Sequence, residues 1–268
     1  MNRLYIVLLS IMMLVIIAPT AMMVAPAQLS ATAKSKLQKV ISDADTKLAS
    51  SLQLQYSTLL KTQEQEQQWD ESIKVIHYKN EEALISVRKQ INLIDNNHLS
   101  KLESQVKQTK ERYRPLFDSY TTLNKQIKAA KLFNNKKLNS SLRAQADVMK
   151  IAVQLARQDI RNKEHTFKVA KDNKTKMVKR LRSALSDIDP IKVKIKSEKA
   201  RMSKTKQRFT SGWRTLNEGI KKSDAKSIMN ALTSLVSISK QVNEHQKKIH
   251  AYEKSINDIV LRVKSQVP

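Results

Sequence analysis

Apolar residues recur at spacings of three and four along most of the chain from Leu37 onward. Such spacings return to one face of an α-helix, so the pattern predicts a series of amphipathic helices. Polar segments rich in Asn, Asp, Ser and Pro interrupt it and predict turns near residues 95–99, 134–139, 187–190 and 217–223. We therefore expect an all-α fold: an elongated antiparallel helical bundle or coiled coil of about five unequal helices.

Three local features refine these helices. Residues 61–68, KTQEQEQQ, favour helix but carry no apolar stripe, which predicts a polar and weakly packed stretch. Pro115 lies inside the second stripe and is expected to kink that helix or restart it. Pro190 is expected to end the preceding helix and to fold the next one back beside it, because a proline disfavours helical backbone in the residue before it.

Disorder is the competing interpretation, because the net charge is high. Leu, Ile, Val and Phe supply 58 of the 235 residues after Ala33. This share of about a quarter exceeds the roughly 20 % below which charged chains usually stay unfolded. The helical periodicity also favours folded helices, with narrow seams whose stability depends on partner chains.

The N-terminus carries an apolar run at residues 4–18, with a positive charge before it and a proline after it. Small residues follow, and this order predicts a secretory signal peptide over residues 1–33, cleaved after Ala27 or Ala33. The alternative is an uncleaved anchor over residues 4–27, which is long enough to span a bilayer. We expect an extracellular or envelope-associated protein, anchored in the membrane if the leader is retained.

Positive charge is distributed unevenly. The chain has 50 Lys and Arg against 24 Asp and Glu, a net charge of +26. Residues 34–98, expected to form one long helix, carry nine basic and nine acidic residues. Residues 99–268, the expected basic bundle region, carry a net charge of +25. Because self-repulsion of this size destabilises a compact chain, we expect an anionic partner for the second region.

Two dense basic clusters flank Pro190, and Glu198 is the single acidic residue between residues 192 and 208. A basic helix face is usually only a solvated surface. Two clusters brought together by a turn at Pro190 would instead add their fields. We therefore expect an anion-binding surface made of Lys171, Lys174, Lys176, Lys179, Arg180, Arg182, Lys192, Lys194, Lys196, Lys199, Arg201, Lys204, Lys206 and Arg208.

The residues that enzymes and metal sites require are scarce. The chain has no Cys, and its two Gly are seven residues apart. These facts exclude disulfides and Cys-ligated zinc, and neither a P-loop nor a dinucleotide-binding loop fits. The five His form no HExxH motif and no pair at i,i+4. We expect no enzymatic activity, no catalytic residue, no metal and no cofactor.

These patterns predict a secreted, non-enzymatic helical protein that associates electrostatically with anionic cell-wall polymers or an anionic lipid surface, and that self-associates through its helical seams. One alternative is a membrane-tethered coiled-coil scaffold that keeps residues 4–27 and binds a protein partner. Another is a nucleic-acid-binding protein, because residues 207–214 interleave basic and aromatic side chains. The leader argues against nucleic acid, and Phe209 and Trp213 lie in phase with the apolar stripe, which favours core packing.

Overall fold

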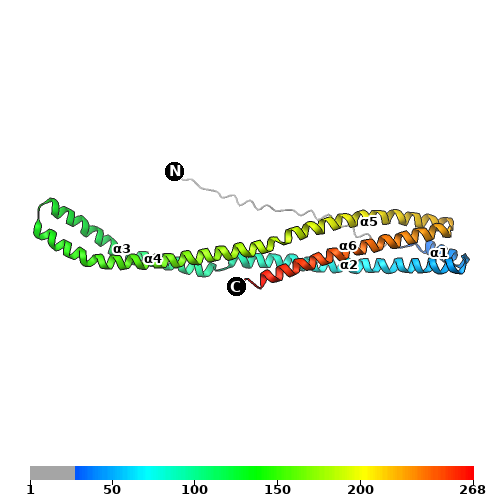
Figure 1. Ribbon diagram of the computed structural model, residues 1–268, viewed down its shortest axis with the longest axis horizontal. Coiled ribbons are helices and arrows are strands. Elements are labelled where there is room, and N and C mark those ends of the chain that lie inside the picture. The colour runs from blue at the N-terminus through cyan, green and yellow to red at the C-terminus, as the bar shows by residue number, and fades with distance from the viewer. Residues whose placement is uncertain (1–27) are drawn as a thin grey trace. The chain divides into compact units, whose positions relative to one another are not determined.

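The computed structural model describes residues 28–268, so residues 1–27 and the greater part of the expected leader lie outside the described part of the chain. Helix makes up 93 % of the described residues, which contain no strand. The expected all-α architecture of long helices is confirmed (Figure 1). The described helices are α1 (Ala31–Asp43), α2 (Thr46–Leu93), α3 (Asn96–Leu132), α4 (Lys136–Ser186), α5 (Ile188–Lys222) and α6 (Ala225–Lys264).

The helix expected over residues 34–98 is divided in two near its start, which raises the number of described helices above the five expected. Ala44 adopts an extended backbone with ψ of 155° and ends α1. Asp45 then caps α2, because its Oδ1 accepts a hydrogen bond from the Leu48 N–H at 2.9 Å. The polar stretch 61–68 stays helical within α2, as expected.

Two of the expected turns are short and depend on asparagine or aspartate. Asn134 between α3 and α4 takes the left-handed backbone conformation (φ 55°), and the Asn135 side chain accepts a hydrogen bond from the Leu138 N–H at 3.1 Å. Between α5 and α6, Ser223 takes φ 54°, and the Asp224 carboxylate caps α6 in the same way. These contacts satisfy backbone groups that the helix ends would otherwise leave without partners.

Pro115 and Pro190 interrupt the helices less than expected. Helix α3 continues through Pro115, so a restart there is wrong. Helix α4 ends at Ser186, close to the expected position, but only Asp187 separates it from α5. Pro190 lies in the first turn of α5, where the missing N–H would have had no helical acceptor.

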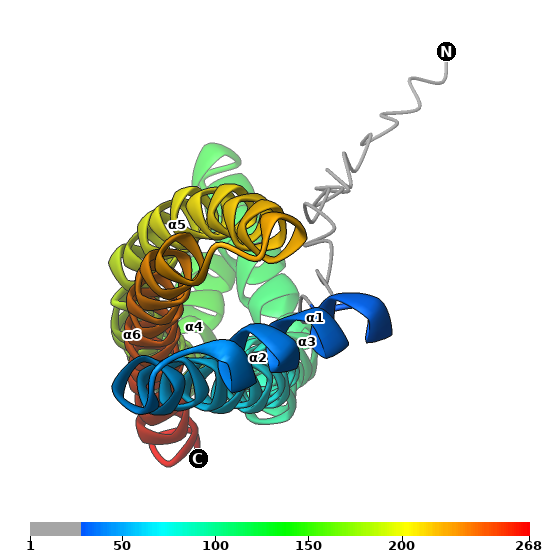
Figure 2. The same cartoon turned by 90° about the vertical axis from the view of Figure 1, so that its right-hand side faces the viewer.

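The described chain divides into two compact units, and α2, α5 and α6 contribute to both. Unit 1 comprises residues 28–65 and 205–241. Its core is formed by buried leucines, isoleucines and valines of α1, α2, α5 and α6, which are neighbouring helices in the end-on view (Figure 2). Phe209 and Trp213 stack with ring centroids 6.0 Å apart and pack against this core, as the stripe predicts.

The two glycines serve helix packing in unit 1. A Cβ atom on Gly212 would come within 3.1 Å of the Leu235 side chain, and one on Gly219 within 3.2 Å of Ile228. Both contacts are tighter than ordinary van der Waals distance, so glycine lets α5 approach α6 closely.

Unit 2 comprises residues 66–204 and 242–268. Helices α2, α4, α5 and α6 form its core around Leu84, Leu181 and Ile249. Helices α3 and α4 extend as an antiparallel hairpin (Figure 1), so that α4 alone spans about 75 Å at 1.5 Å per residue. Away from that core, the hairpin buries few hydrophobic residues, and most of them are alanines: Leu123, Ala130, Ala146, Val153 and Ala156.

Leu232→Ala is expected to destabilise unit 1 by about 2–5 kcal/mol, because Leu232 is fully buried and the truncation leaves a cavity. The matched variant Leu54→Ala, at a site of the same unit that is 63 % exposed, is expected to change the stability by less than about 0.5 kcal/mol. The measurement is urea unfolding followed by tryptophan fluorescence in a Trp69→Phe background, where Trp213 alone reports on unit 1. Equal midpoints for the two variants would contradict this packing.

Candidate functional site

The first predicted cluster lies on α4 within unit 2. Lys171, Lys174, Lys179 and Arg182 lie on one side of the helix, whereas Lys176 and Arg180 point to another side. A shallow cleft of about 350 Å³ is lined by Lys174, Thr175, Val178, Lys179 and Arg182. The structure thus concentrates four of the six predicted side chains along one open, basic face.

Neutral amides hold two of these side chains in place. The Arg182 guanidinium donates a hydrogen bond to Asn92 Oδ1 at 2.8 Å, and Lys174 Nζ donates to Asn96 Oδ1. Both asparagines flank the junction of α2 and α3. An amide oxygen carries no net charge, so it orients the cation without neutralising it, and the face keeps its positive potential.

The second predicted cluster is distributed over both units and around α5. Lys192, Lys196 and Lys199 lie on one flank of the apolar stripe, and Lys194, Arg201 and Lys204 lie on the other, all in unit 2. Lys206 and Arg208 belong to unit 1, where Arg208 donates to Gln241 Oε1 at 3.4 Å. The second cluster therefore forms no single basic face.

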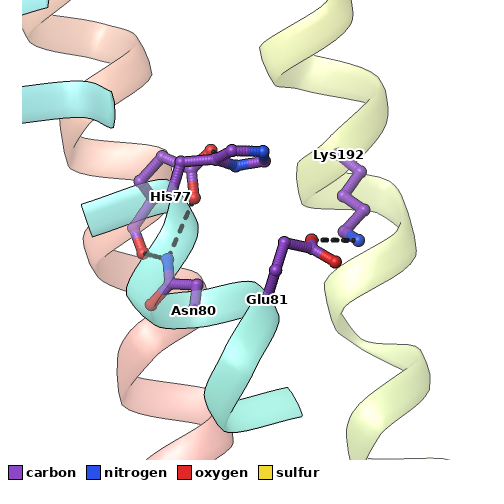
Figure 3. A network of polar contacts seen from close by, with 5 residues as sticks. His77, Asn80, Glu81 and Lys192 are labelled. Atoms are coloured by element: carbon purple, nitrogen blue, oxygen red, sulfur yellow. Dashed lines mark hydrogen bonds and ion pairs between the residues drawn. The ribbon is translucent and has the colours of Figure 1, made fainter. Parts of the chain in front are cut away.

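Lys192 and Arg201 of this cluster have carboxylate partners. Lys192 Nζ lies 2.8 Å from Glu81 Oε1, and the two side chains approach each other from α5 and α2 (Figure 3). Arg201 Nη1 lies 3.1 Å from Glu198 Oε1. These pairs neutralise part of the predicted surface within the protein itself.

The expectation that Pro190 folds the second cluster back beside the first is wrong. Helix α5 continues in the direction of α4 with no reversal at their junction (Figure 1). Asp187 keeps helical dihedral angles of −61° and −15°, which explains why the chain does not turn. The clusters therefore follow one another along the chain and do not face each other.

A buried polar layer in unit 2 was not predicted. The Glu253 side chain on α6 is only 2 % exposed, and its Oε1 lies 2.9 Å from Nδ1 of His77 on α2. Asn80, one turn further along α2 and next to His77 in Figure 3, donates from Nδ2 to Glu253 Oε2 at 2.9 Å and to the Glu253 carbonyl at 2.8 Å. The carboxylate thus links α2 to α6 in a defined register.

A second buried carboxylate links α5 to α6 in the same unit. Glu198 is 6 % exposed, and its Oε2 lies 2.6 Å from Nδ1 of His245. Gln246, fully buried beside His245 in sequence, donates to Asp70 Oδ1 at 2.6 Å and so joins α6 to α2. Three helices of unit 2 are therefore connected by polar groups between their apolar layers.

The surroundings favour the ionised form of both buried glutamates. Burial opposes ionisation of Glu253, but the hydrogen bonds with His77 and Asn80 outweigh it and lower the pKa of this carboxyl. The hydrogen bond with His245 lowers the pKa of Glu198 against the opposing effect of burial. Nearby positive charges of Lys199 for Glu253, and of Lys248 and Arg201 for Glu198, act in the same direction.

A sequence signal for these residues exists. Glu253 falls in phase with Ile249 and Ile256, and Glu198 falls in phase with Ile195 and Met202. An acidic residue at a core position of an amphipathic stripe indicates either a buried ion pair or a broken stripe. The partners His77 and His245 lie 176 and 47 residues away in sequence, so only the fold identifies them.

No group of three or more His, Asp or Glu side chains among residues 28–268 is arranged to hold a metal ion. Within the same range, no helix combines the length and the apolar character needed to cross a membrane. Comparisons with protein-family models, curated proteins and solved structures found no match for this chain.

Glu253→Gln is expected to lower the free energy of unfolding at neutral pH by about 1–3 kcal/mol, because it weakens the contacts to His77 and Asn80 in a buried layer. It should also flatten the acid limb of the stability profile. A carboxyl whose pKa is lowered by folding stabilises the protein above its unfolded value of about 4.3. That contribution is lost as the pH falls through the lower folded-state pKa.

The measurement is the thermal unfolding midpoint, recorded in 0.15 M salt at a series of pH values from neutral to strongly acidic. Glu244→Gln is the matched control, since Glu244 lies on the same helix but is exposed and pairs with Lys247 across one turn. Salt screens that exposed pair, so the control should follow the unsubstituted protein. Identical acid limbs for Glu253→Gln and the unsubstituted protein would refute the stabilising role of the buried pair.

Proposed function

We propose that this chain is a secreted, non-enzymatic helical protein that associates electrostatically with an anionic surface of the cell envelope. The observation that carries the proposal is the basic face of α4, where Lys171, Lys174, Lys179 and Arg182 share one side and three of them line a cleft. Negatively charged groups arranged along a polymer or a headgroup layer fit such a face, because each cation can contact a separate anion.

The charge of the α3–α4 hairpin supports the same proposal. Residues 96–186 contain 22 Lys and Arg against seven Asp and Glu. Internal pairing uses few of them, as in Arg112 with Asp159 at 2.8 Å and Lys110 with Glu164 at 2.6 Å. The excess cations face solvent over most of the hairpin, so an anionic surface would relieve their mutual repulsion.

Export remains part of the proposal, and the start of α1 bears on the choice of cleavage site. Ser30 caps α1 by accepting a hydrogen bond from the Ala33 N–H at 3.2 Å. Leu29 and Ala33 pack against the core of unit 1. Cleavage after Ala33 would remove these contacts, whereas cleavage after Ala27 would keep them. We therefore favour Ala27 among the two predicted sites.

Nucleic acid is a weaker candidate than the envelope. The aromatic residues that would stack on bases, Phe209 and Trp213, are half-buried and pack against the core of unit 1. Stacking on bases requires exposed ring faces.

The test is the retention of residues 28–268 on isolated cell walls and on anionic vesicles. The fourfold variant Lys171→Gln, Lys174→Gln, Lys179→Gln and Arg182→Gln is expected to bind about 100-fold more weakly at low salt. The estimate follows from about 1 kcal/mol for each basic residue at an anionic surface, with allowance for non-additivity. Both proteins should be released near molar salt.

The matched control removes the same number of charges from α2, where Lys61, Lys79, Arg88 and Lys89 are exposed. We expect this control to keep most of the retention, because the region around it has no net charge. Retention that is insensitive to salt, or equal losses in the two fourfold variants, would reject the proposed surface.

A further inference from the structure

The turn of the α3–α4 hairpin exposes large apolar side chains. Leu132, the last residue of α3, is 82 % exposed, and Phe133 in the turn is 83 % exposed. Leu138, in the first turn of α4, is 48 % exposed. Exposed apolar side chains that are grouped, and not scattered singly, mark surfaces that contact a partner or a membrane.

All of the charged residues around this turn are basic. The 28 residues from Ser119 to Ala146 contain no Asp or Glu. Their six basic residues are all exposed: Lys125, Lys128, Lys131, Lys136, Lys137 and Arg143. The hairpin tip, defined here as residues 119–146, thus has a net charge of +6 around the exposed side chains of Leu132 and Phe133.

The fold fixes this arrangement. Asn139 Nδ2 donates to the Ile127 carbonyl at 3.0 Å and joins the two helices just before the turn. Asn134 in the left-handed conformation and Asn135 as the cap of α4 close the turn within three residues. Leu132 and Phe133 are therefore held in solvent where α3 ends and α4 begins, and Figure 1 places this turn at one extremity of the hairpin.

We infer that the hairpin tip docks on an anionic lipid bilayer, with Leu132 and Phe133 entering the headgroup region and the lysines contacting lipid phosphates. A soluble polyanion would neutralise the lysines but would leave the apolar side chains in water. A second copy of the tip would cover them but would bring equal positive charges together. An anionic bilayer matches both features, because it offers hydrocarbon beneath a layer of negative charge.

Long lysine side chains suit this position. Their aliphatic part packs along apolar surface while the ammonium group stays at the level of the phosphates. The inference deepens the proposed function and rests on it, since it selects lipid as the anionic partner of this part of the chain. It adds a docking point at the α3–α4 turn. Lys136, which follows that turn, lies about 57 Å along α4 from Lys174, at 1.5 Å per residue over 38 residue steps.

The experiment uses the absence of cysteine, which lets a single introduced thiol carry an environment-sensitive fluorophore. Residues 28–268 with Phe133→Cys, Ile151→Cys or Val193→Cys are labelled and mixed with phosphatidylcholine vesicles with or without phosphatidylglycerol. Ile151 and Val193 are controls with exposed apolar side chains on α4 and α5. We expect a blue shift only at position 133 and only with phosphatidylglycerol.

A second variant tests the apolar contribution without a label. Leu132→Ser with Phe133→Ser is expected to weaken vesicle binding about tenfold or more and to leave binding to soluble polyphosphate unchanged, because only lipid buries these side chains. The sites are exposed, so the fold should persist, and the circular dichroism spectrum checks this. Equal effects of the double variant on vesicles and on polyphosphate would overturn the lipid assignment.

The remaining outcomes separate the two proposals. Vesicle binding with no shift at position 133, or with a shift at position 151 instead, overturns the tip as the docking point and leaves the envelope association intact. Absence of binding to anionic vesicles overturns the tip inference, and retention on isolated walls then decides whether the envelope association survives. Failure on both vesicles and walls rejects both.

Discussion

Repulsion between like charges is the constraint that limits the stability of the α3–α4 hairpin. The α3–α4 hairpin carries 22 basic and seven acidic residues, while its own seam buries mainly alanines and a few larger side chains such as Leu123 and Val153. A seam of this kind supplies little hydrophobic stabilisation per turn. The same charge that would attract an anionic surface therefore weakens the hairpin in isolation, and stability and binding are coupled through mass action.

The remaining helices of unit 2 are held differently. Glu253 joins α6 to α2, and Glu198 joins α6 to α5, each through a histidine at hydrogen-bond distance. Buried pairs of this kind add little net stability compared with apolar residues, but they disfavour other registers, which would leave a charge buried without a partner. We interpret the polar layer as the feature that fixes how three long, similar stripes align, so that the hairpin extends from a base of defined geometry.

The fold was largely predictable because helical periodicity and turn-forming residues are local signals. The stripes located the long helices, and Asn134 and Ser223 lie in turns within or beside the predicted ranges. The break at Asp45 was missed although its capping chemistry is also local. Pro190 was misjudged because its effect depends on whether the helix restarts in the same direction, which Asp187 decides.

The candidate site was less predictable, because exposure and pairing are tertiary properties. The density of basic residues along the sequence predicted a site from Lys192 to Arg208. The fold distributes these residues around α5, however, and pairs Lys192 with Glu81. The basic face at Lys174 and Arg182, and the exposed apolar side chain of Phe133, depend on which sides of α3 and α4 meet.

Hydrogen exchange of residues 28–268, with and without polyphosphate at constant ionic strength, tests the coupling between anion binding and the stability of the α3–α4 hairpin. We expect polyphosphate to raise protection most along residues 96–186. Unchanged exchange there, or protection confined to residues 46–65, would contradict it.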